Sequence, residues 1–441
     1  MVSKENPFSG KERKKTMAEQ KKIKIGVFGV GRGRAYMNHL ADPIGTELVA
    51  ICDKDEVRLA ECNKTRNVAA YTDFDEFIKH PGMEAVFLAN YFNEHAPFAI
   101  KALKAGLHVY SECAAIGTLK EGIELCEAVE ESGKVYMFGE NHGFHRCGLE
   151  MKRLYDAGEI GEIMYAEGEY NHPSTGVAPT GGYRLVDSPY HWRAWMPTTY
   201  YCTHAMGPLM YVTGQKPVAV NARSILLKDR DAHAAGRFIS FRDSGGAASL
   251  VTMDNGAVFR IFGTGIPGHC NSYRYHGTRG AMEMVHGPGY YGPGELRVWH
   301  EPLHRKPDQP GERKYYPEWP AYGDLANRTG HCGADFWANL FFTDAIRNGT
   351  KPVFDVYDGC AMSAVGICGW KSAIEGGKEV EIPDFRDKVA REKYRDDDFS
   401  PIPFQEGARW IKNTIRDVTF DQQIEEAKKC YEYNYNYYNH K

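Results

Sequence analysis

Short apolar runs alternate with segments of helical periodicity over the first third of the chain. Ala96, Ile100 and Leu103 recur at the spacing of one helix face, and Gly106 follows as a helix stop. The apolar runs are KIKIGVF (22–28), ELVAIC (47–52), AVFLAN (85–90), HVYSE (108–112) and VYMFGE (135–140). Runs of this kind between helices are typical of parallel strands covered on both faces. We therefore predict an α/β domain with a doubly wound parallel sheet over residues 21–145.

The pattern changes after a helix predicted near residues 145–158. Strand-forming segments then follow one another, with short turns such as Asn255-Gly256 that favour antiparallel hairpins. The sequence thus predicts a C-terminal α+β domain over residues 146–390, with a large, open, mainly antiparallel sheet. Its strand-forming segments are MYAEGEY (164–170), VAVNARSI (218–225), RFISFR (237–242), AASLVTM (247–253), AVFRIF (257–262) and NSYRYHG (271–277).

Other segments differ in composition from these two domains. Residues 287–328 are rich in Pro, Gly, Tyr and Trp, which predicts an insertion or lid rather than regular structure. Helices are predicted near 333–348 and 355–375. Residues 391–441 form a C-terminal extension whose aromatic end, YEYNYNYYNHK, either docks on a neighbouring subunit or is disordered. Residues 1–20 are polar and predict a disordered or extended tail.

Composition and charge exclude several classes of protein. The chain has 441 residues, 42% of them hydrophobic, and a net charge of −4 with basic residues spread throughout. We therefore expect neither nucleic acid nor a membrane as a partner, and no apolar run is long enough to span a bilayer. Eleven scattered cysteines and the lack of a signal sequence favour reduced thiols in a cytoplasmic protein. We predict no metal site.

A glycine-rich turn follows the first predicted strand in GVFGVGRGR (26–34). Gly29 and Gly31 match the first two positions of the Gly-x-Gly-x-x-Gly motif, while the third position is Arg34, with Gly33 beside it. Such a turn lets a pyrophosphate approach the N-terminus of the next helix. Asp53 ends the second strand, 22 residues after Gly31, where an acid can bind the adenosine ribose. These residues predict a Rossmann domain that binds NAD rather than NADP.

From about Lys22 to Phe385 the chain resembles the Gfo/Idh/MocA oxidoreductases. The resemblance rests on GVFGVGRGR, AIKALKAGLHVYSECAA (99–115), KRLYDAGEIGEI (152–163) and HCGADF (331–336) with DAIRNGTKPVFDVYDG (344–359). It implies an NAD-dependent enzyme whose C-terminal domain holds the substrate and often forms homo-oligomers. The predicted cofactor-binding residues are Gly29, Gly31, Arg32, Gly33, Arg34, Asp53, Asn90, Glu112 and Asn141.

Two positions depart from the pattern of the family's sugar dehydrogenases. The sequence Glu112-Cys113-Ala114 stands where those enzymes have Glu-Lys-Pro, so their proton-transferring Lys is replaced by Cys113. Tyr200, four residues before His204, occupies the place of their Asp. Two groups that handle protons in the ordinary dehydrogenase mechanism are therefore absent.

The chain is more similar to the NAD-dependent α-N-acetylgalactosaminidase branch, which also lacks that Lys. Matching segments are Glu140-Asn141, a Gly-Glu-Tyr ending at Tyr170, and Tyr-Cys-Thr-His from Tyr201 to His204. This resemblance implies that Tyr201 and His204 lie near the C3 hydroxyl of a sugar, that Tyr170 is the base at C2, and that Glu140 lies near the sugar or the nicotinamide. Tyr170 and His204 also fit a purely structural interpretation as interior side chains.

Four further residues are predicted to contact substrate: Trp192, Arg193, His331 and Asp335. The tryptophan can stack on a sugar or an aromatic aglycone, although buried packing explains it equally well. The resemblance places His331 and Asp335 near the active site, and they could equally cap the helix that follows.

These observations lead to three hypotheses about function. The first is an NAD-dependent oxidoreductase that oxidises a ring hydroxyl, at C3, of a sugar or glycoside to a 3-oxo product. The second is a redox-neutral glycosidase that holds NAD tightly and recycles its hydride through oxidation, elimination, hydration and re-reduction. The third is a non-catalytic NAD protein that senses sugars.

Overall fold

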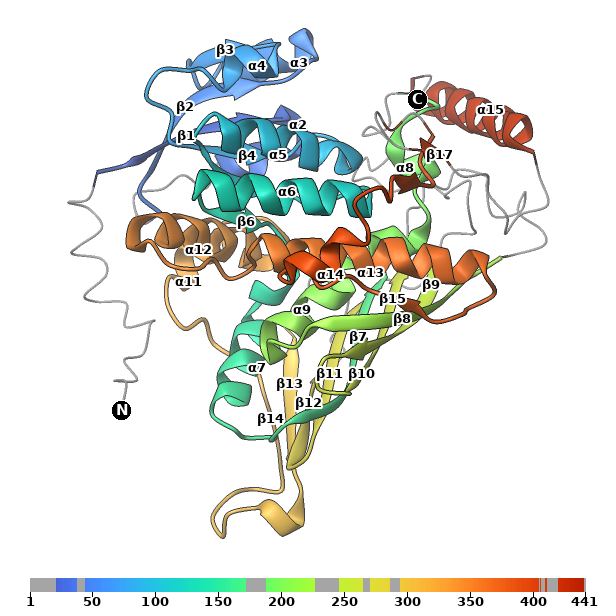
Figure 1. The fold of residues 1–441 in the computed structure, drawn as a ribbon. Coiled ribbons are helices and arrows are strands. Elements are labelled where there is room, and N and C mark those ends of the chain that lie inside the picture. The colour runs from blue at the N-terminus through green and yellow to red at the C-terminus, as the bar shows by residue number, and fades with distance from the viewer. Residues whose placement is uncertain are drawn as a thin grey trace.

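The computed structural model describes residues 21–37, 44–171, 188–226, 246–264, 270–285, 294–403, 405, 409–410 and 419–439. Figure 1 shows two sheets at opposite ends of the molecule with helices between them. The first 20 residues and the predicted strand at 237–242 lie outside the described residues.

The N-terminal part is a six-stranded parallel sheet with the order β3-β2-β1-β4-β5-β6, which confirms the Rossmann prediction. The five predicted strands all form, and the structure adds β3, which the sequence reading missed. The strands are β1 (Ile23–Phe28), β2 (Thr46–Cys52), β3 (Ala69–Tyr71), β4 (Ala85–Leu88), β5 (His108–Ser111) and β6 (Tyr136–Phe138). The helices are α2 (Val30–Met37), α3 (Glu56–Asn63), α4 (Phe74–Phe77), α5 (His95–Lys104) and α6 (Leu119–Ser132).

The C-terminal part is built on a nine-stranded sheet with the order β14-β13-β12-β11-β7-β10-β9-β8-β15. The pairing is antiparallel except between β10 and β7, which confirms the predicted mainly antiparallel sheet. Its strands are β7 (Ile163–Asn171), β8 (Pro217–Ser224), β9 (Gly246–Met253), β10 (Val258–Thr264), β11 (Cys270–Gly277), β12 (Gly280–Val285), β13 (Glu295–His300), β14 (Glu312–Tyr315) and β15 (Val380–Glu381).

The prediction that residues 287–328 lack regular structure was wrong for β13 and β14. Leu296 and Val298 are fully buried and alternate with polar residues, which is the two-residue period of a half-buried strand. The Pro and Gly residues that dominated the composition lie around these strands rather than within them. An averaged composition therefore concealed a strand of only six residues.

Two long helices lie between the sheets (Figure 1). Helix α13 (Val356–Ile374) is buried on most of its surface because it packs on β8 of the large sheet and on α6 and β6 of the Rossmann part. Both α12 (Ala334–Asn348) and α13 match the predicted helices, and Asp355 caps α13 by accepting a hydrogen bond from the Asp358 backbone N–H.

Shorter elements complete the described fold. The aromatic tail belongs to helix α15 through Asn439, and none of the described helices is long and apolar enough to cross a membrane. The remaining helices and strands are α7 (Arg146–Asp156), α8 (Trp192–Trp195), α9 (Thr203–Thr213), α11 (Gly323–Ala326), α14 (Lys388–Glu392), α15 (Phe420–Asn439), β16 (Phe399–Ser400) and β17 (Arg409–Trp410).

Candidate active site

The glycine turn between β1 and α2 has the shape that a dinucleotide requires. Gly29 has φ +88°, and a Cβ there would lie 2.4 Å from the Ala89 carbonyl oxygen. A Cβ on Gly31 would meet nothing closer than 3.9 Å, so its backbone is open to a ligand. Gly33 packs on β1, because a Cβ there would lie 2.5 Å from Val27 Cγ1. Gly33 therefore does the close packing that the motif assigns to its third glycine, and Arg34 is exposed.

Asp53 lies directly beside this turn at the end of β2. Its Oδ2 accepts a hydrogen bond from the Val30 backbone N–H (2.9 Å), and Oδ1 accepts one from the Asp55 N–H (3.0 Å). The side-chain amide of Asn90, after β4, has buried N and O atoms with no hydrogen-bond partner among the described residues. A polar ligand at the carboxyl edge of the sheet would satisfy them. The turn, the carboxylate and the unsatisfied amide all fit a dinucleotide.

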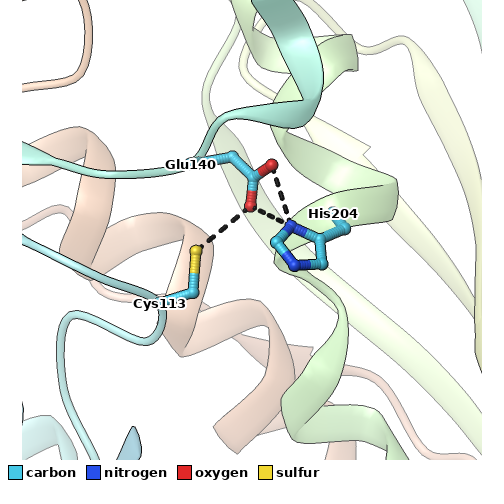
Figure 2. A group of neighbouring side chains, drawn as sticks. All are labelled: Cys113, Glu140 and His204. Carbon is cyan, nitrogen blue, oxygen red and sulfur yellow. Dashed lines mark hydrogen bonds and ion pairs between the residues drawn. The ribbon is translucent and has the colours of Figure 1, made fainter. Parts of the chain in front are cut away.

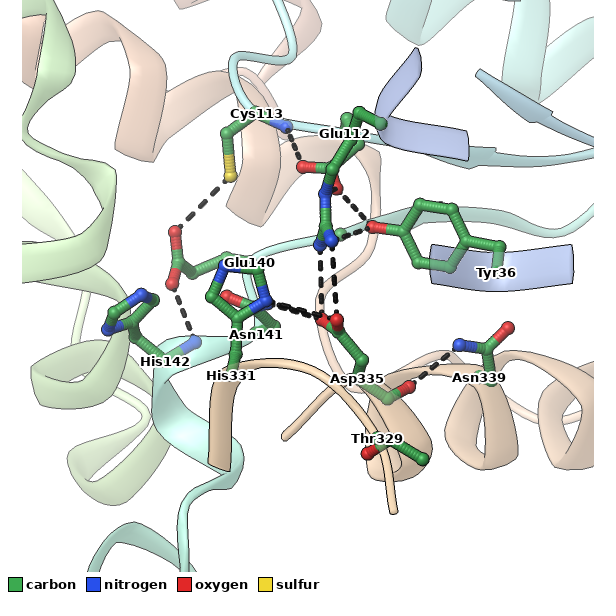
Figure 3. A network of polar contacts seen from close by, with 12 residues as sticks. Tyr36, Glu112, Cys113, Glu140, Asn141, His142, Thr329, His331, Asp335 and Asn339 are labelled. Atoms are coloured by element: carbon green, nitrogen blue, oxygen red, sulfur yellow. Dashed lines mark hydrogen bonds and ion pairs between the residues drawn. The ribbon is translucent and has the colours of Figure 1, made fainter. Parts of the chain in front are cut away.

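A buried ionic network joins the glycine turn to helix α12 (Figure 3). Arg32 Nε donates to Glu112 Oε1 at 2.6 Å, and its Nη atoms donate to the two carboxylate oxygens of Asp335 at 3.0 and 3.2 Å. The Tyr36 hydroxyl also donates to Glu112. Asp335 further accepts from Asn141 Nδ2 at 2.7 Å and pairs with His331 Nδ1 at 3.0 Å. Arg32, Glu112, Asn141, His331 and Asp335, predicted as separate contacts, thus form one cluster.

The network keeps its acids charged despite burial. Burial by itself would raise the pKa of Asp335, but Arg32 and His331 hold that pKa well below its usual range. Burial likewise opposes ionisation of Glu112, and the Arg32 charge with the Tyr36 hydroxyl outweighs it and lowers the Glu112 pKa. The two carboxylates therefore stay ionised around one guanidinium at neutral pH.

A second buried cluster contains Glu140 and His204 (Figure 2). Glu140 follows β6, is fully buried, and bonds His204 Nδ1 through its two carboxylate oxygens at 3.0 and 2.8 Å. The Cys113 thiol donates to Glu140 Oε2 at 3.3 Å, because burial and the nearby carboxylate raise the pKa of that thiol. Gly207 makes room for this arrangement, since a Cβ there would lie 2.2 Å from Glu140 Cγ.

Both predicted catalytic tyrosines lie against His204. The ring of Tyr170, at the end of β7, is 4.7 Å from the His204 ring, and the ring of Tyr201 is 5.4 Å from it. The two tyrosine rings are 5.8 Å apart. The fold therefore brings together the four residues predicted to be catalytic, Glu140, Tyr170, Tyr201 and His204, although they come from three separate segments.

Sequence reasoning missed two histidines of this region. The His142 ring lies 4.1 Å from that of His204 and 5.0 Å from that of Tyr170. His145 lies 5.1 Å from His142, and burial lowers its pKa to about 4, so it is neutral at physiological pH. Their position directly after Glu140-Asn141 was the available signal.

A row of aromatic side chains leads from Tyr201 to Trp192. Phe92 stacks on Tyr201 (5.8 Å) and on Trp192 (4.9 Å). A cavity of about 400 Å³ is lined by Trp192 and by Lys54, the neighbour of Asp53. Trp192 therefore lies at a cavity whose lining does not include Glu140 or His204, so its predicted contact with substrate stays a prediction. The side chain of Arg193 lies outside the described residues.

The sequence also contains a metalloprotease-like spacing, His300-Glu301-Pro302-Leu303-His304, which requires a helix to align its histidines. His300 instead ends β13 and pairs with Glu159 at 2.9 Å, and His304 is exposed in a short 3₁₀ turn. The spacing therefore builds no zinc site.

Comparison with known families agrees with this geometry. Residues 23–140 match the family model described as "Oxidoreductase family, NAD-binding Rossmann fold", and residues 251–391 match "Glycosyl hydrolase 109, C-terminal domain". Residues 23–140 therefore form an NAD-binding domain of the Gfo/Idh/MocA oxidoreductase type, and the chain as a whole is similar to that family.

Individual relatives match most of this chain. "Glycosyl hydrolase family 109 protein 4" of Phocaeicola vulgatus is 24% identical over 84% of this chain and 79% of its own. "Alpha-N-acetylgalactosaminidase" of Tannerella forsythia is 26% identical over 82% of this chain and 86% of its own. Among solved structures, levoglucosan dehydrogenase in complex with NADH is similar in fold, with a TM-score of 0.67 and 22% identity over 82% of this chain and all of that one.

Replacing Asp53 tests the choice of cofactor. In Asp53→Asn we expect NADH to bind about tenfold more weakly, because a charged hydrogen-bond acceptor for the ribose is lost. The ratio of NADPH to NADH affinity should rise, since a 2′-phosphate no longer meets a carboxylate. Fluorescence titration with both cofactors measures this. Asp55→Asn, at the N-cap of α3, is the control, and an equal loss for both cofactors in Asp53→Asn would contradict the assignment.

Replacing Asp335 tests the ionic network. Asp335→Asn should lower the free energy of unfolding by about 2–3 kcal/mol at pH 7. This loss is smaller than that for breaking a fully buried ion pair, because the Arg32 side chain is 31% exposed to solvent. The folded-state pKa of Asp335 is depressed, so its stabilisation is present above its unfolded pKa and is lost as pH falls through the folded value.

The variant should therefore lose less stability than the parent between neutral and acid pH. Thermal unfolding midpoints across this range give the comparison. Exposed Asp308 provides the matched control, Asp308→Asn, which should behave as the parent does. If the unfolding midpoints of the parent and of Asp335→Asn fell in parallel as the pH is lowered, the stability of the network would not depend on ionisation of Asp335.

Proposed function

We propose that this protein uses NAD to oxidise a ring hydroxyl, at C3, of a sugar or glycoside, giving a 3-oxo product. The observation that carries the proposal is the Glu140–His204 pair with Tyr170 and Tyr201 against it, at the carboxyl edge of an NAD-binding sheet. Relatives named for glycoside hydrolysis and a similar fold in a sugar dehydrogenase support a carbohydrate substrate.

The chain's own residues have distinct roles in this proposal. Glu140 binds Nδ1 of His204 and thereby directs Nε2 toward the substrate as the proton acceptor for the C3 hydroxyl. Tyr201 positions the same hydroxyl. The bound nicotinamide supplies the hydride acceptor. Arg32 takes no part in this proton transfer, because its guanidinium group is held in ion pairs with Glu112 and Asp335.

A redox-neutral glycosidase is the second candidate, favoured by the match of residues 251–391 to the glycosyl hydrolase 109 domain. Once C3 is a ketone, the proton at C2 becomes acidic and Tyr170 removes it, so that the aglycone leaves from C1. Water then adds and the hydride returns to C3. Tyr170 has the rings of His142 and His204 as neighbours, at 5.0 and 4.7 Å.

One assay distinguishes the two candidates. The enzyme is incubated with NAD and a chromogenic glycoside while NADH absorbance and aglycone release are followed together. NADH formed in step with substrate consumption supports the oxidoreductase. Aglycone released without net NADH supports the glycosidase. Ligand binding with neither signal would support the sugar sensor instead. Homo-oligomerisation and a cytoplasmic location remain predictions.

His204→Ala should abolish hydride transfer, with at least about a hundredfold loss of kcat, because the hydroxyl proton then has no acceptor. NADH should still bind with unchanged affinity, measured by fluorescence. His276→Ala, an exposed histidine on β11, is the control and should retain full activity. Unchanged turnover in His204→Ala would remove His204 from the mechanism.

Tyr170→Phe should impair C2 deprotonation more than oxidation. The measurement is exchange of C2 hydrogen for deuterium in D₂O, followed by NMR, beside the initial rate of NAD reduction. Tyr165→Phe, on the same strand but bonded to Glu167, serves as the control. Persistent C2 exchange in Tyr170→Phe would assign the base to another residue.

A further inference from the structure

The Cys113, Glu140 and His204 side chains converge from three separate parts of the fold (Figure 2). Cys113 follows β5, Glu140 follows β6, and His204 lies in the first turn of α9. All three residues are buried, and one ligand atom from each lies within 4.8 Å of the other two. We propose that these three residues bind a divalent transition metal of the zinc type.

The ligand set matches that chemistry. A thiolate sulfur, an imidazole nitrogen and a carboxylate oxygen are the donors that zinc takes, whereas Mg²⁺ and Ca²⁺ prefer oxygen alone. Three protein ligands with one position left open is the arrangement of catalytic rather than structural zinc sites.

The geometry requires only a small adjustment. Tetrahedral zinc holds neighbouring N, O and S ligands about 3.3–3.6 Å apart. The corresponding separations here are 2.8 Å from His204 Nδ1 to Glu140 Oε2 and 3.3 Å from Cys113 Sγ to the same oxygen. Moving the His204 ring about half an ångström away from Glu140 Oε2 would give that pair a zinc-like separation. The Cys113 and His204 ligand atoms, which lie within 4.8 Å of each other, would close around the metal.

The charges also balance. Glu140 is fully buried, and among the described residues its recorded ion pair is with His204 alone, so no Lys or Arg neutralises it. A deprotonated Cys113 and an ionised Glu140 carry two negative charges, which a divalent cation cancels in this low-dielectric setting. Metal uptake would release the Cys113 proton to solvent.

The metal site would give the proposed oxidation a second way to remove the hydroxyl proton. This role of the metal, unlike metal binding itself, rests on the proposed function. The substrate hydroxyl binds at the open metal position beside Tyr170 and Tyr201, its pKa falls, and its proton leaves to water. The carbon then loses hydride to NAD⁺ as the carbonyl forms. His204 acts in this case as a ligand rather than as the base.

Cobalt titration of the chelator-treated, dialysed protein tests binding without any substrate. The reference protein for this titration, called the parent below, carries Cys332→Ser. The substitution removes the exposed Cys332 thiol, which would otherwise compete for cobalt. We expect one Co²⁺ per chain and a thiolate-to-cobalt charge-transfer band, with zinc displacing the cobalt. Cys113→Ser should remove the band and weaken zinc binding at least about a hundredfold, since loss of even an outer partner costs 10–100-fold. Cys62→Ser, which removes another buried thiol, should bind as the parent does.

The outcomes separate the two proposals. No charge-transfer band in the parent, or zinc affinity unchanged in Cys113→Ser, would overturn the metal site and leave a hydrogen-bonded Glu140–His204 pair. Full NADH formation by the metal-free enzyme would overturn the metal's part in oxidation while the proposed function stands. Stoichiometric metal binding without oxidation or cleavage of any glycoside would refute the proposed function and leave the metal site intact.

Discussion

The Asp335 carboxylate is the point on which the arrangement of the two sheets depends. It is fully buried at the start of α12 and accepts hydrogen bonds from Arg32 of the glycine turn and from Asn141 after β6. A buried charge of this kind is tolerated only when its partners are in place, so it fixes α12 against the Rossmann part. The residue before Asn141 is Glu140, and the same network therefore also sets the position of the Glu140–His204 cluster.

The two buried carboxylates of Glu112 and Glu140 have different surroundings. Glu112 pairs directly with Arg32, a permanent cation that it shares with Asp335. Glu140 faces a thiol and an imidazole, neither of which is a permanent cation. The proposed chemistry is assigned to Glu140 because, among the described residues, no Lys or Arg pairs with it. This difference explains why Glu112 is better regarded as a positioning residue.

Much of the fold could be predicted because the period of a pattern depends on local geometry. All five predicted Rossmann strands form, and α12 and α13 lie where the helical spacing placed them. Strand β3 was missed because three residues are too few to show a period. Strands β13 and β14 were missed because surrounding Pro and Gly dominated the average composition.

The sequence by itself determined the type of each element, the glycine turn with Asp53, and which residue types were available for chemistry. Only the tertiary structure decided which of them meet. Cys113 was first recognised as the loss of a lysine, and the fold places its thiol on Glu140, 27 positions away, beside His204. The fold likewise brings His142 against His204 and Asp335 against Arg32. Long-range contacts depend on how sheets and helices pack, and no local period encodes that packing.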